Sequence, residues 1–102
     1  MVNMMKLMKQ AQSMQKNMEK LQAELAAREY EATSGGGMVK AIIKGDMTVT
    51  SLSIDPKVID PSDVDMLQDL IISAVNTGLS NAREDAASEM GKVTGGLGIP
   101  GM

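Results

Sequence analysis

The sequence lacks the side chains that carry most enzyme chemistry. Its 102 residues contain no cysteine, no histidine, no tryptophan and no phenylalanine, and tyrosine occurs once. Without cysteine the chain has neither disulfides nor thiolate metal ligands, which fits a cytosolic protein. Without histidine it has no side chain that normally titrates near neutral pH, and no Ser-His-Asp triad is possible. The composition therefore argues against an enzyme and predicts no cofactor and no metal site.

Long apolar runs are absent as well. No stretch approaches the roughly 20 apolar residues that span a bilayer, and no apolar signal-peptide core is visible at the N-terminus. Apolar residues still make up 43% of the chain, which predicts a folded single domain rather than a disordered chain. We expect residues 1–93 to form this domain. Residues 94–102 contain four glycines and are expected to form a mobile tail.

Charge is distributed unevenly along the chain. The net charge is −3 and the isoelectric point is about 4.8, values that are unusual for a nucleic-acid-binding domain. Residues 1–28, however, hold five basic and two acidic side chains, whereas residues 55–102 hold three basic and eight acidic ones. Because the local field decides what an anion meets near a surface, the N-terminal segment is the candidate anion-binding region.

The N-terminal segment has the pattern of a long amphipathic helix from Met4 to about Ala27. Its apolar side chains alternate spacings of three and four, which is the seam of a coiled coil: Met4, Leu7, Ala11, Met14, Met18, Leu21 and Leu25. A helix of this length measures roughly 36 Å, more than a compact domain of about 13 Å radius of gyration covers. The helix either packs on its own sheet or extends along a partner. We favour a second copy of the chain, with Leu7, Met14, Met18 and Leu21 in the dimer interface.

Four lysines lie on the opposite side of this helix. Lys6, Lys9, Lys16 and Lys20 fall within about 80° of one another and span roughly 21 Å along the axis. We refer to these four residues as the lysine stripe. Such a row matches a phosphate backbone, although charged rows on helices often serve only solubility. The lysine stripe is the candidate DNA-binding site.

A three-stranded antiparallel meander is predicted over residues 28–33, 38–44 and 47–54. Gly45-Asp46 is expected to be a two-residue hairpin turn. Val49 and Leu52 have opposite parity, which predicts a bulge near Thr50-Ser51. Residues 35–37 are all glycine; they precede a strand rather than a helix, so we interpret them as a turn and not as a phosphate-binding loop.

A second helix is predicted from Pro61 to about Lys92, with Asp60 as its N-cap. Its broad apolar face is expected to cover the sheet: Val64, Leu67, Leu70, Ile71, Ala74, Val75, Gly78, Ala82 and Ala86. Asp65 and Asp69 lie one turn apart, but acidic residues at a helix start are far commoner than magnesium sites. The elements together predict an α+β protomer of the order α-β-β-β-α.

The side chains that are missing also restrict the kind of nucleic acid. A single aromatic residue offers no stacking platform for unpaired bases. Two arginines, Arg28 and Arg83, allow little bidentate readout of guanine. Any such contact is therefore expected on the phosphates of double-stranded DNA, with limited sequence specificity.

Short motifs along nearly the whole chain resemble the YbaB/EbfC family of bacterial nucleoid-associated proteins. The motifs are the Met/Gln/Lys-rich segment Met4 to Leu25, Gly35-Gly36-Gly37-Met38-Val39, Gly45-Asp46, Leu52-Ser53-Ile54-Asp55-Pro56, Asp60-Pro61, Leu67-Gln68-Asp69-Leu70-Ile71, Ala74-Val75-Asn76 and Met90-Gly91-Lys92-Val93-Thr94-Gly95-Gly96. The resemblance implies an α-β-β-β-α protomer and a homodimer whose long helices protrude. It also implies DNA binding in the cytoplasmic nucleoid, without catalysis and with an influence on nucleoid organisation and gene expression.

Two other interpretations remain open at the level of sequence. One is a protein–protein adaptor that holds another protein with its helical arms and does not bind DNA. The other is an interfacial membrane helix over residues 4–25, which is disfavoured because the seam has no tryptophan or phenylalanine. We therefore expect double-stranded DNA and a second copy of the chain as partners, with no membrane and no small-molecule substrate.

Overall fold

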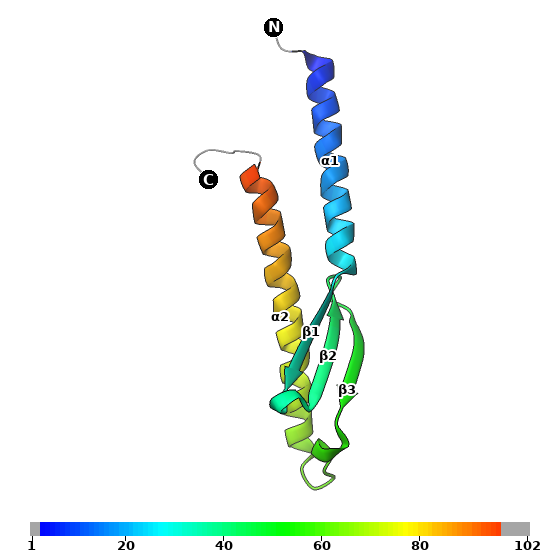
Figure 1. Cartoon of the computed structure of the whole chain (residues 1–102), viewed down its shortest axis with the longest axis vertical. Coiled ribbons are helices and arrows are strands. Elements are labelled where there is room, and N and C mark those ends of the chain that lie inside the picture. Colours follow the sequence, from blue (N-terminus) through cyan, green and yellow to red (C-terminus); the bar gives the residue numbers. More distant parts are fainter. Residues whose placement is uncertain (1–2, 97–102) are drawn as a thin grey trace.

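The chain forms two long helices joined through a small antiparallel sheet (Figure 1). The computed structural model describes the backbone of residues 3–96 and the side chains of residues 3–93. The elements are α1 (Met4–Ala27), β1 (Glu29–Ser34), β2 (Val39–Lys44), β3 (Val49–Ile54) and α2 (Val64–Gly96), with 3-10 turns at Gly35–Gly37 and Pro56–Val58. The predicted α+β architecture is confirmed.

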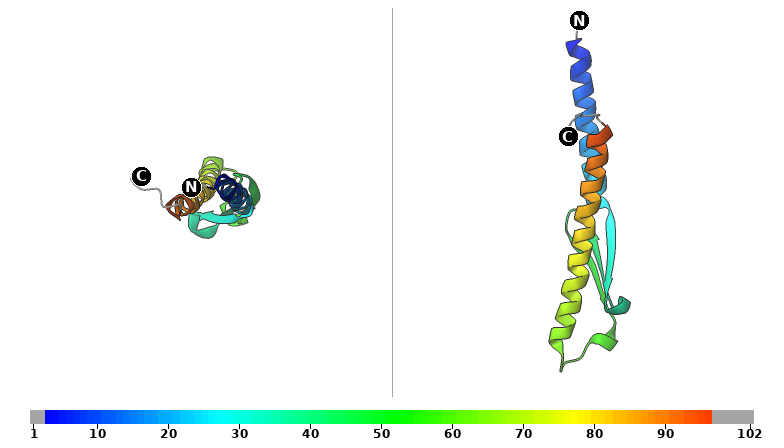
Figure 2. Two further views of the ribbon diagram at one scale, coloured as in Figure 1. Left: turned by 90° about the horizontal axis from the view of Figure 1, so that it is seen from above. Right: turned by 90° about the vertical axis from the view of Figure 1, so that its left-hand side faces the viewer.

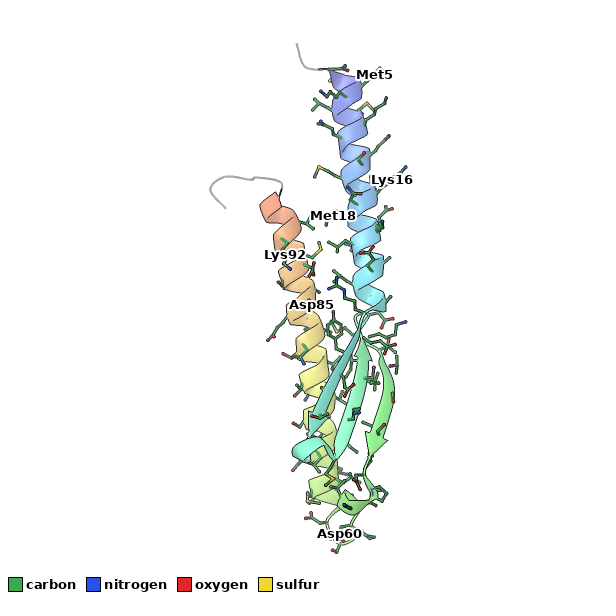
Figure 3. The ribbon with its side chains drawn as sticks, viewed as in Figure 1. Met5, Lys16, Met18, Asp60, Asp85 and Lys92 are labelled. Carbon is green, nitrogen blue, oxygen red and sulfur yellow. The ribbon has the colours of Figure 1, made fainter. Side chains whose placement is uncertain are left out.

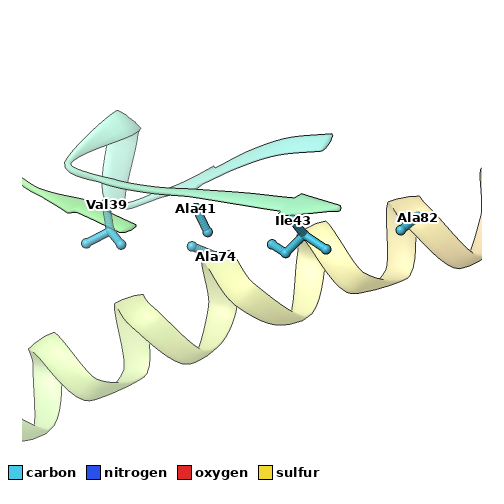
Figure 4. Close-up of a cluster of buried hydrophobic side chains, with 5 residues drawn as sticks. All are labelled: Val39, Ala41, Ile43, Ala74 and Ala82. Atoms are coloured by element: carbon cyan, nitrogen blue, oxygen red, sulfur yellow. The ribbon is translucent and has the colours of Figure 1, made fainter. Parts of the chain in front are cut away.

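The core lies between α2 and one face of the sheet. The strand order is β1-β2-β3, and the register places Ala32 opposite Ala41 and Ala41 opposite Leu52. Strand β2 is in the middle, and its inward side chains Val39, Ala41 and Ile43 are fully buried against α2 (Figure 4). The prediction that the second helix packs on the sheet is therefore confirmed for β1 and β2, whereas β3 stays largely uncovered. The core is thin, since Ile43 and Val39 are its largest fully buried side chains.

Small residues let α2 approach the sheet closely. Ala74, Gly78 and Ala82 are buried on the side of the helix that faces β2. A Cβ atom on Gly78 would lie 2.2 Å from Cδ1 of Ile43. The Ile43 side chain thus occupies the space that the missing Gly78 side chain leaves, and this interlock holds helix and sheet together.

The predicted irregularity of the third strand is present as a β-bulge. Ile42 pairs with Ser51 whereas Ile43 pairs with Val49, so Thr50 is the extra residue. The Thr50 hydroxyl donates to the carbonyl oxygen of Ile42 at 3.2 Å. The bulge explains why Val49 and Leu52, three residues apart, both face the side of the sheet on which α2 lies.

The hairpin turn between β2 and β3 is longer than predicted. Lys44 N–H donates to Thr48 O at 2.8 Å and Met47 N–H donates to Lys44 O at 2.9 Å. The loop therefore contains three residues instead of the two-residue Gly45-Asp46 turn, and β3 begins at Val49 rather than at Met47. Three-residue hairpin loops place their last residue in the left-handed region. That residue is Met47, with φ of 67°.

Replacing Met47 with glycine is expected to stabilise the protein by about 1 kcal/mol, because glycine adopts this conformation without the steric cost that Cβ imposes. Met47→Ala is the matched control, since it removes the same exposed side chain but keeps Cβ. Urea unfolding at one protomer concentration measures both. Equal stability of the glycine and alanine variants would show that the positive φ carries no cost.

Helix α2 begins later than the sequence pattern predicted. Its N-cap is Asp63, whose Oδ1 accepts from Met66 N–H at 3.2 Å. Asp60 instead closes a turn, in which its Oδ1 accepts from Ser62 N–H at 2.9 Å and Asp63 N–H donates to Asp60 O. The prediction of Asp60 as N-cap with Pro61 as the first helical residue was wrong, since an Asp-Pro pair suits a turn equally well.

The C-terminal boundary also differs from the prediction. Helix α2 continues to Gly96, so residues 94–96 are helical and do not belong to a tail. The rest of the predicted tail, residues 97–102, lies outside the described residues.

The molecule is a rod with one free arm. Its extents are 76 × 26 × 16 Å and its radius of gyration is 20.3 Å, against about 13 Å for a compact chain of this size. Figures 1 and 2 show that the N-terminal part of α1 extends beyond the end of α2. The first helix thus protrudes, as the family resemblance implied, and does not pack along its whole length on its own sheet.

Candidate nucleic-acid interface

The candidate interface is built on helix α1, whose start is set by a local cap. The Asn3 side chain accepts from the backbone N–H groups of Met5 at 3.1 Å and Lys6 at 3.3 Å. No acidic residue occupies the first turn, so the positive end of the helix dipole is not neutralised there. The arm therefore begins with a positive terminus next to the first lysine.

The structure brings the four lysines of the stripe to one exposed side of α1. All four are solvent-exposed. Figure 3 shows Lys16 projecting away from α2 whereas Met18 projects toward it. Within residues 3–93, no carboxylate lies within 4.0 Å of any of these ammonium groups. The four ammonium groups are thus free of ion pairs within the described residues, while Glu19 and Glu24, one helical turn from Lys16 and Lys20, reduce the positive field at that end of the stripe.

Three other basic residues are engaged within the chain. Lys40 lies 3.4 Å from Glu31, and Lys92 lies 3.4 Å from Glu89. Arg28 lies 2.9 Å from Asp85 and 3.6 Å from Glu89. Arg28 is half of the arginine content, so its pairing further reduces what is available for reading base edges.

The apolar seam of α1 divides into two parts. Leu25 is buried, and Met18 and Leu21 are half-buried. A cleft of about 250 Å³ lies here between the two helices, lined by Met14, Asn17, Met18, Leu21 and Val93. Met14 and Leu7 are more exposed. Of the four predicted interface residues, Met18 and Leu21 face the chain's own α2, while Leu7 lies on the part of the arm that extends past it.

A polar cluster that sequence reasoning missed joins the base of α1 to α2. Oδ2 of Asp85 accepts from Tyr30 Oη at 2.5 Å and from Arg28 Nη1 at 2.9 Å. These hydrogen bonds hold the pKa of Asp85 below its usual value. Partial burial, reinforced by the Asp85 carboxylate, raises the pKa of Tyr30. The only sequence signal was that Tyr30 is the sole aromatic residue, because nothing local links it to a residue 55 positions away.

The base of the arm rests on the tip of the β2–β3 hairpin. Gly45 N–H donates to Arg28 O at 2.9 Å. A Cβ atom on Gly45 would lie 1.7 Å from the carbonyl oxygen of Leu25. The turn therefore needs glycine here for a reason that the sequence pattern did not reveal, which is the close approach of the end of α1.

An apolar part of the sheet remains uncovered. Helix α2 lies over β1 and β2, and the inward residues of β3 extend past it: Val49 is 44% exposed and Leu52 is 42% exposed. Adjoining apolar side chains on the surface of a small protein commonly mark a contact with another macromolecule.

The described residues were also compared with what a metal site and a membrane-spanning helix require. In the part of the chain that the structure describes, no three histidine, cysteine, aspartate or glutamate side chains are grouped so as to hold a metal ion. Asp65 and Asp69 thus have no third partner of this kind. None of the helices over residues 3–96 is long and apolar enough to cross a membrane.

The sequence of the chain is similar to those of known DNA-binding and nucleoid-associated proteins. A model of the YbaB/EbfC DNA-binding family matches residues 1–97. A nucleoid-associated protein of Alkaliphilus metalliredigens is 53% identical over 98% of the chain and 88% of its own length. One from Clostridium acetobutylicum is 52% identical over 98% of the chain and 89% of its own length.

A solved structure supports the fold. The crystal structure of an uncharacterized protein from Helicobacter pylori superposes with a TM-score of 0.75 and covers 92% of this chain and 99% of that one. At 22% identity the likeness concerns the fold alone.

Proposed function

Because the chain belongs to the YbaB/EbfC DNA-binding family, we propose that it is a nucleoid-associated protein that binds duplex DNA as a homodimer. The family is one of DNA-binding proteins and not of enzymes. The proposed contacts are mainly to phosphates, with limited sequence specificity. The proposed location is the nucleoid within the cytoplasm, where such binding influences nucleoid organisation and gene expression.

The observation that carries the proposal is the lysine stripe. Lys6, Lys9, Lys16 and Lys20 are exposed and have no carboxylate partner within 4.0 Å in residues 3–93. Lys16 projects away from α2 (Figure 3), and the helical spacing puts the other three on the same side of α1. Lysine ammonium groups bind phosphate as point charges without requiring a particular base. Each phosphate neutralised releases condensed counterions from the DNA, which supplies the binding free energy.

The acidic second half of the chain is compatible with this function. The lysine stripe lies on the protruding arm, whereas residues 55–69, which hold five of the eight acidic side chains of the second half, form the opposite end of the rod (Figures 1 and 3). Asp85 and Glu89 lie nearer the arm, but they are paired with Arg28 and Lys92. Charges separated by more than a Debye length of about 8 Å at physiological ionic strength are largely screened from each other. DNA bound along the arm therefore meets the field of the lysine stripe rather than the net charge of the protein.

The proposed homodimer is supported by the amount of surface that one chain exposes. The accessible surface is 7303 Å², whereas a compact protein of 10.8 kDa exposes about 5,500 Å². A stable interface buries about 800 Å² per partner, so the excess is sufficient for one. We propose that the second copy covers the seam residues Leu7, Met14, Met18 and Leu21 and the uncovered inner row of β3.

Glutamate at Leu7 and Met14 is accordingly expected to convert the dimer into a monomer at micromolar concentration, because an interface that buries unpaired carboxylates loses several kcal/mol. Sedimentation equilibrium measures the change. Gln12→Glu with Ser13→Glu adds the same charge on the other side of α1 and is expected to leave the dimer intact. Leu52→Glu tests the β3 row in the same way. If both the Leu7/Met14 variant and the Leu52→Glu variant remain dimeric, the interface lies elsewhere.

The proposed function is tested by titrating the protein into a fluorescent random-sequence duplex at several salt concentrations. The logarithm of the affinity should fall linearly with the logarithm of the salt concentration, and the slope counts the phosphates neutralised. A dimer with two stripes is expected to show a slope of several charges. No binding at low salt would refute the proposal and favour the protein–protein adaptor, which a defined co-purifying partner would identify.

A further inference from the structure

We propose that Asp85 is a positioning residue for DNA binding: with Tyr30 and Arg28 it holds the arm α1 in a fixed direction relative to α2. This inference rests on the proposed function, because it concerns how the lysine stripe is presented to DNA. Asp85 itself contacts no phosphate in this arrangement. Its role is exerted through the base of the arm.

Packing alone leaves the direction of the arm weakly determined. Helix α2 packs along β1 and β2, while between the arm and the C-terminal part of α2 lies the cleft of about 250 Å³. A void of this size means that the facing side chains have few partner atoms across it. Leu25 is the one buried side chain of α1 among the described residues, and like the contact with Gly45 it lies at the C-terminal end of the helix. Contacts confined to one end set the angle of a helix of 24 residues only weakly.

The polar cluster supplies a second point of attachment. Arg28 is the residue directly after α1 and Tyr30 belongs to β1, and both donate to one carboxylate oxygen of α2, at 2.9 and 2.5 Å. Glu89, one turn beyond Asp85, lies 3.6 Å from the Arg28 guanidinium. Hydrogen bonds to ionised groups are about twice as strong as neutral ones. The base of α1 is thus attached at two separate points, to the β2–β3 hairpin at Gly45 and to α2 at Asp85. Two points of attachment restrict the direction of the arm more than one does.

A fixed arm has a direct consequence for binding. When the two stripes of a dimer already have the spacing that the duplex requires, less conformational freedom is lost on association. Loosening the arm should therefore lower the affinity without changing the number of phosphates neutralised. This separates a positioning role from a direct role in binding, since removing a lysine that binds a phosphate lowers the salt slope by about 1.

Asp85→Asn provides the test. We expect a several-fold weaker affinity for the random-sequence duplex and an unchanged salt slope. Tyr30→Phe removes one of the two hydrogen bonds and keeps the ring, so it should lower the affinity less. Asp85→Asn combined with Glu89→Gln should lower the affinity more. Glu84→Gln is the matched control: the neighbouring carboxylate is exposed and, in the part of the chain described, has no ion pair. Far-UV circular dichroism verifies that each variant is folded.

A distance measurement without DNA makes the result independent of the proposed function. Because the chain has no cysteine, spin labels can be attached at Gln12→Cys and Ser88→Cys, both exposed. Labelled protein is diluted with unlabelled protein, so that the measured distances join two labels of one protomer and not labels of different protomers. The distance distribution is expected to be broader in the Asp85→Asn background than in the wild-type or Glu84→Gln background.

The outcomes separate the two proposals. An unchanged distance distribution overturns the positioning role of Asp85, whatever the DNA titration shows. A broader distribution with unchanged affinity overturns its link to DNA binding. If the wild-type protein has no affinity for DNA, the proposed function fails, and the distance distribution still decides whether Asp85 holds the arm.

Discussion

Lys9→Glu with Lys16→Glu is expected to weaken binding to a random-sequence duplex by about 4,000-fold at 0.1 M salt, because each phosphate that is no longer neutralised reduces the affinity by roughly a factor of eight at that concentration. A dimer carries four of these lysines. The slope of log affinity against log salt should fall by about 4, since each lysine contributes a slope of about 1. Fluorescence anisotropy of a labelled duplex at four or five salt concentrations measures both quantities.

The control variant has the same net charge as the Lys9/Lys16 variant, but its reversed charges lie elsewhere on the protein. Lys40→Glu with Lys57→Glu reverses the same number of charges on the sheet and on the Pro56–Val58 turn, away from the arm (Figure 1). We expect its salt slope to remain that of the wild-type protein. An equal loss of affinity in the two double variants would show that overall charge, and not the lysine stripe, governs binding.

Gly78→Val is expected to destabilise the protein by about 3 kcal/mol, because added side-chain volume in a close-packed core is costly. Its Cβ would lie 2.2 Å from Cδ1 and 3.2 Å from Cγ1 of Ile43, so that this fully buried side chain would have to change its position in the core. Ile43→Ala is expected to cost about 3 kcal/mol through the cavity that it leaves. Each loss is a large fraction of the 5–15 kcal/mol that stabilises a domain of about this size.

The double variant tests the interlock directly. In the double variant, valine at position 78 fills part of the space that Ile43→Ala opens. We therefore expect the double variant to lose about 2 kcal/mol less free energy of unfolding than the sum of the losses of the two single variants. Urea unfolding followed by circular dichroism, at one fixed protomer concentration, gives the three free energies of unfolding. Gly91→Val is the control, since no heavy atom lies within 4 Å of a Cβ there. Strict additivity would show that the two side chains do not share one space.

Features that depend on near neighbours in the chain were predicted correctly. The bounds of α1, the three strands to within two residues and the Thr50 bulge all follow from periods of 3.6 and 2 residues. The same rule placed the lysine stripe opposite the seam. The role of the stripe in DNA binding and that of the seam in a dimer stay predictions, because no part of the single chain shows its partners.

Features that depend on competition between local signals were predicted less well. Asp60-Pro61 and Asp63 both suit a helix start, and only the course of the chain after β3 decides that Asp63 is the cap. Met47 occupies a left-handed position that usually belongs to glycine, so the loop length was misjudged. The glycines at 95 and 96 suggested that α2 ends near Lys92, but both are included in the helix.

The sequence alone determined which elements form and which side of each is apolar or charged, since both are set by residues three or four positions apart in a helix and two apart in a strand. Only the tertiary structure decided that Asp85 meets Tyr30 and Arg28, that Gly45 lies against Leu25, and that α2 leaves β3 uncovered. These interactions join residues that are far apart in the chain, up to 57 positions in the case of Arg28 and Asp85. Whether such residues meet depends on how closely the elements pack, as where Ile43 occupies the space beside Gly78, and the spacing of residues along the chain does not encode that.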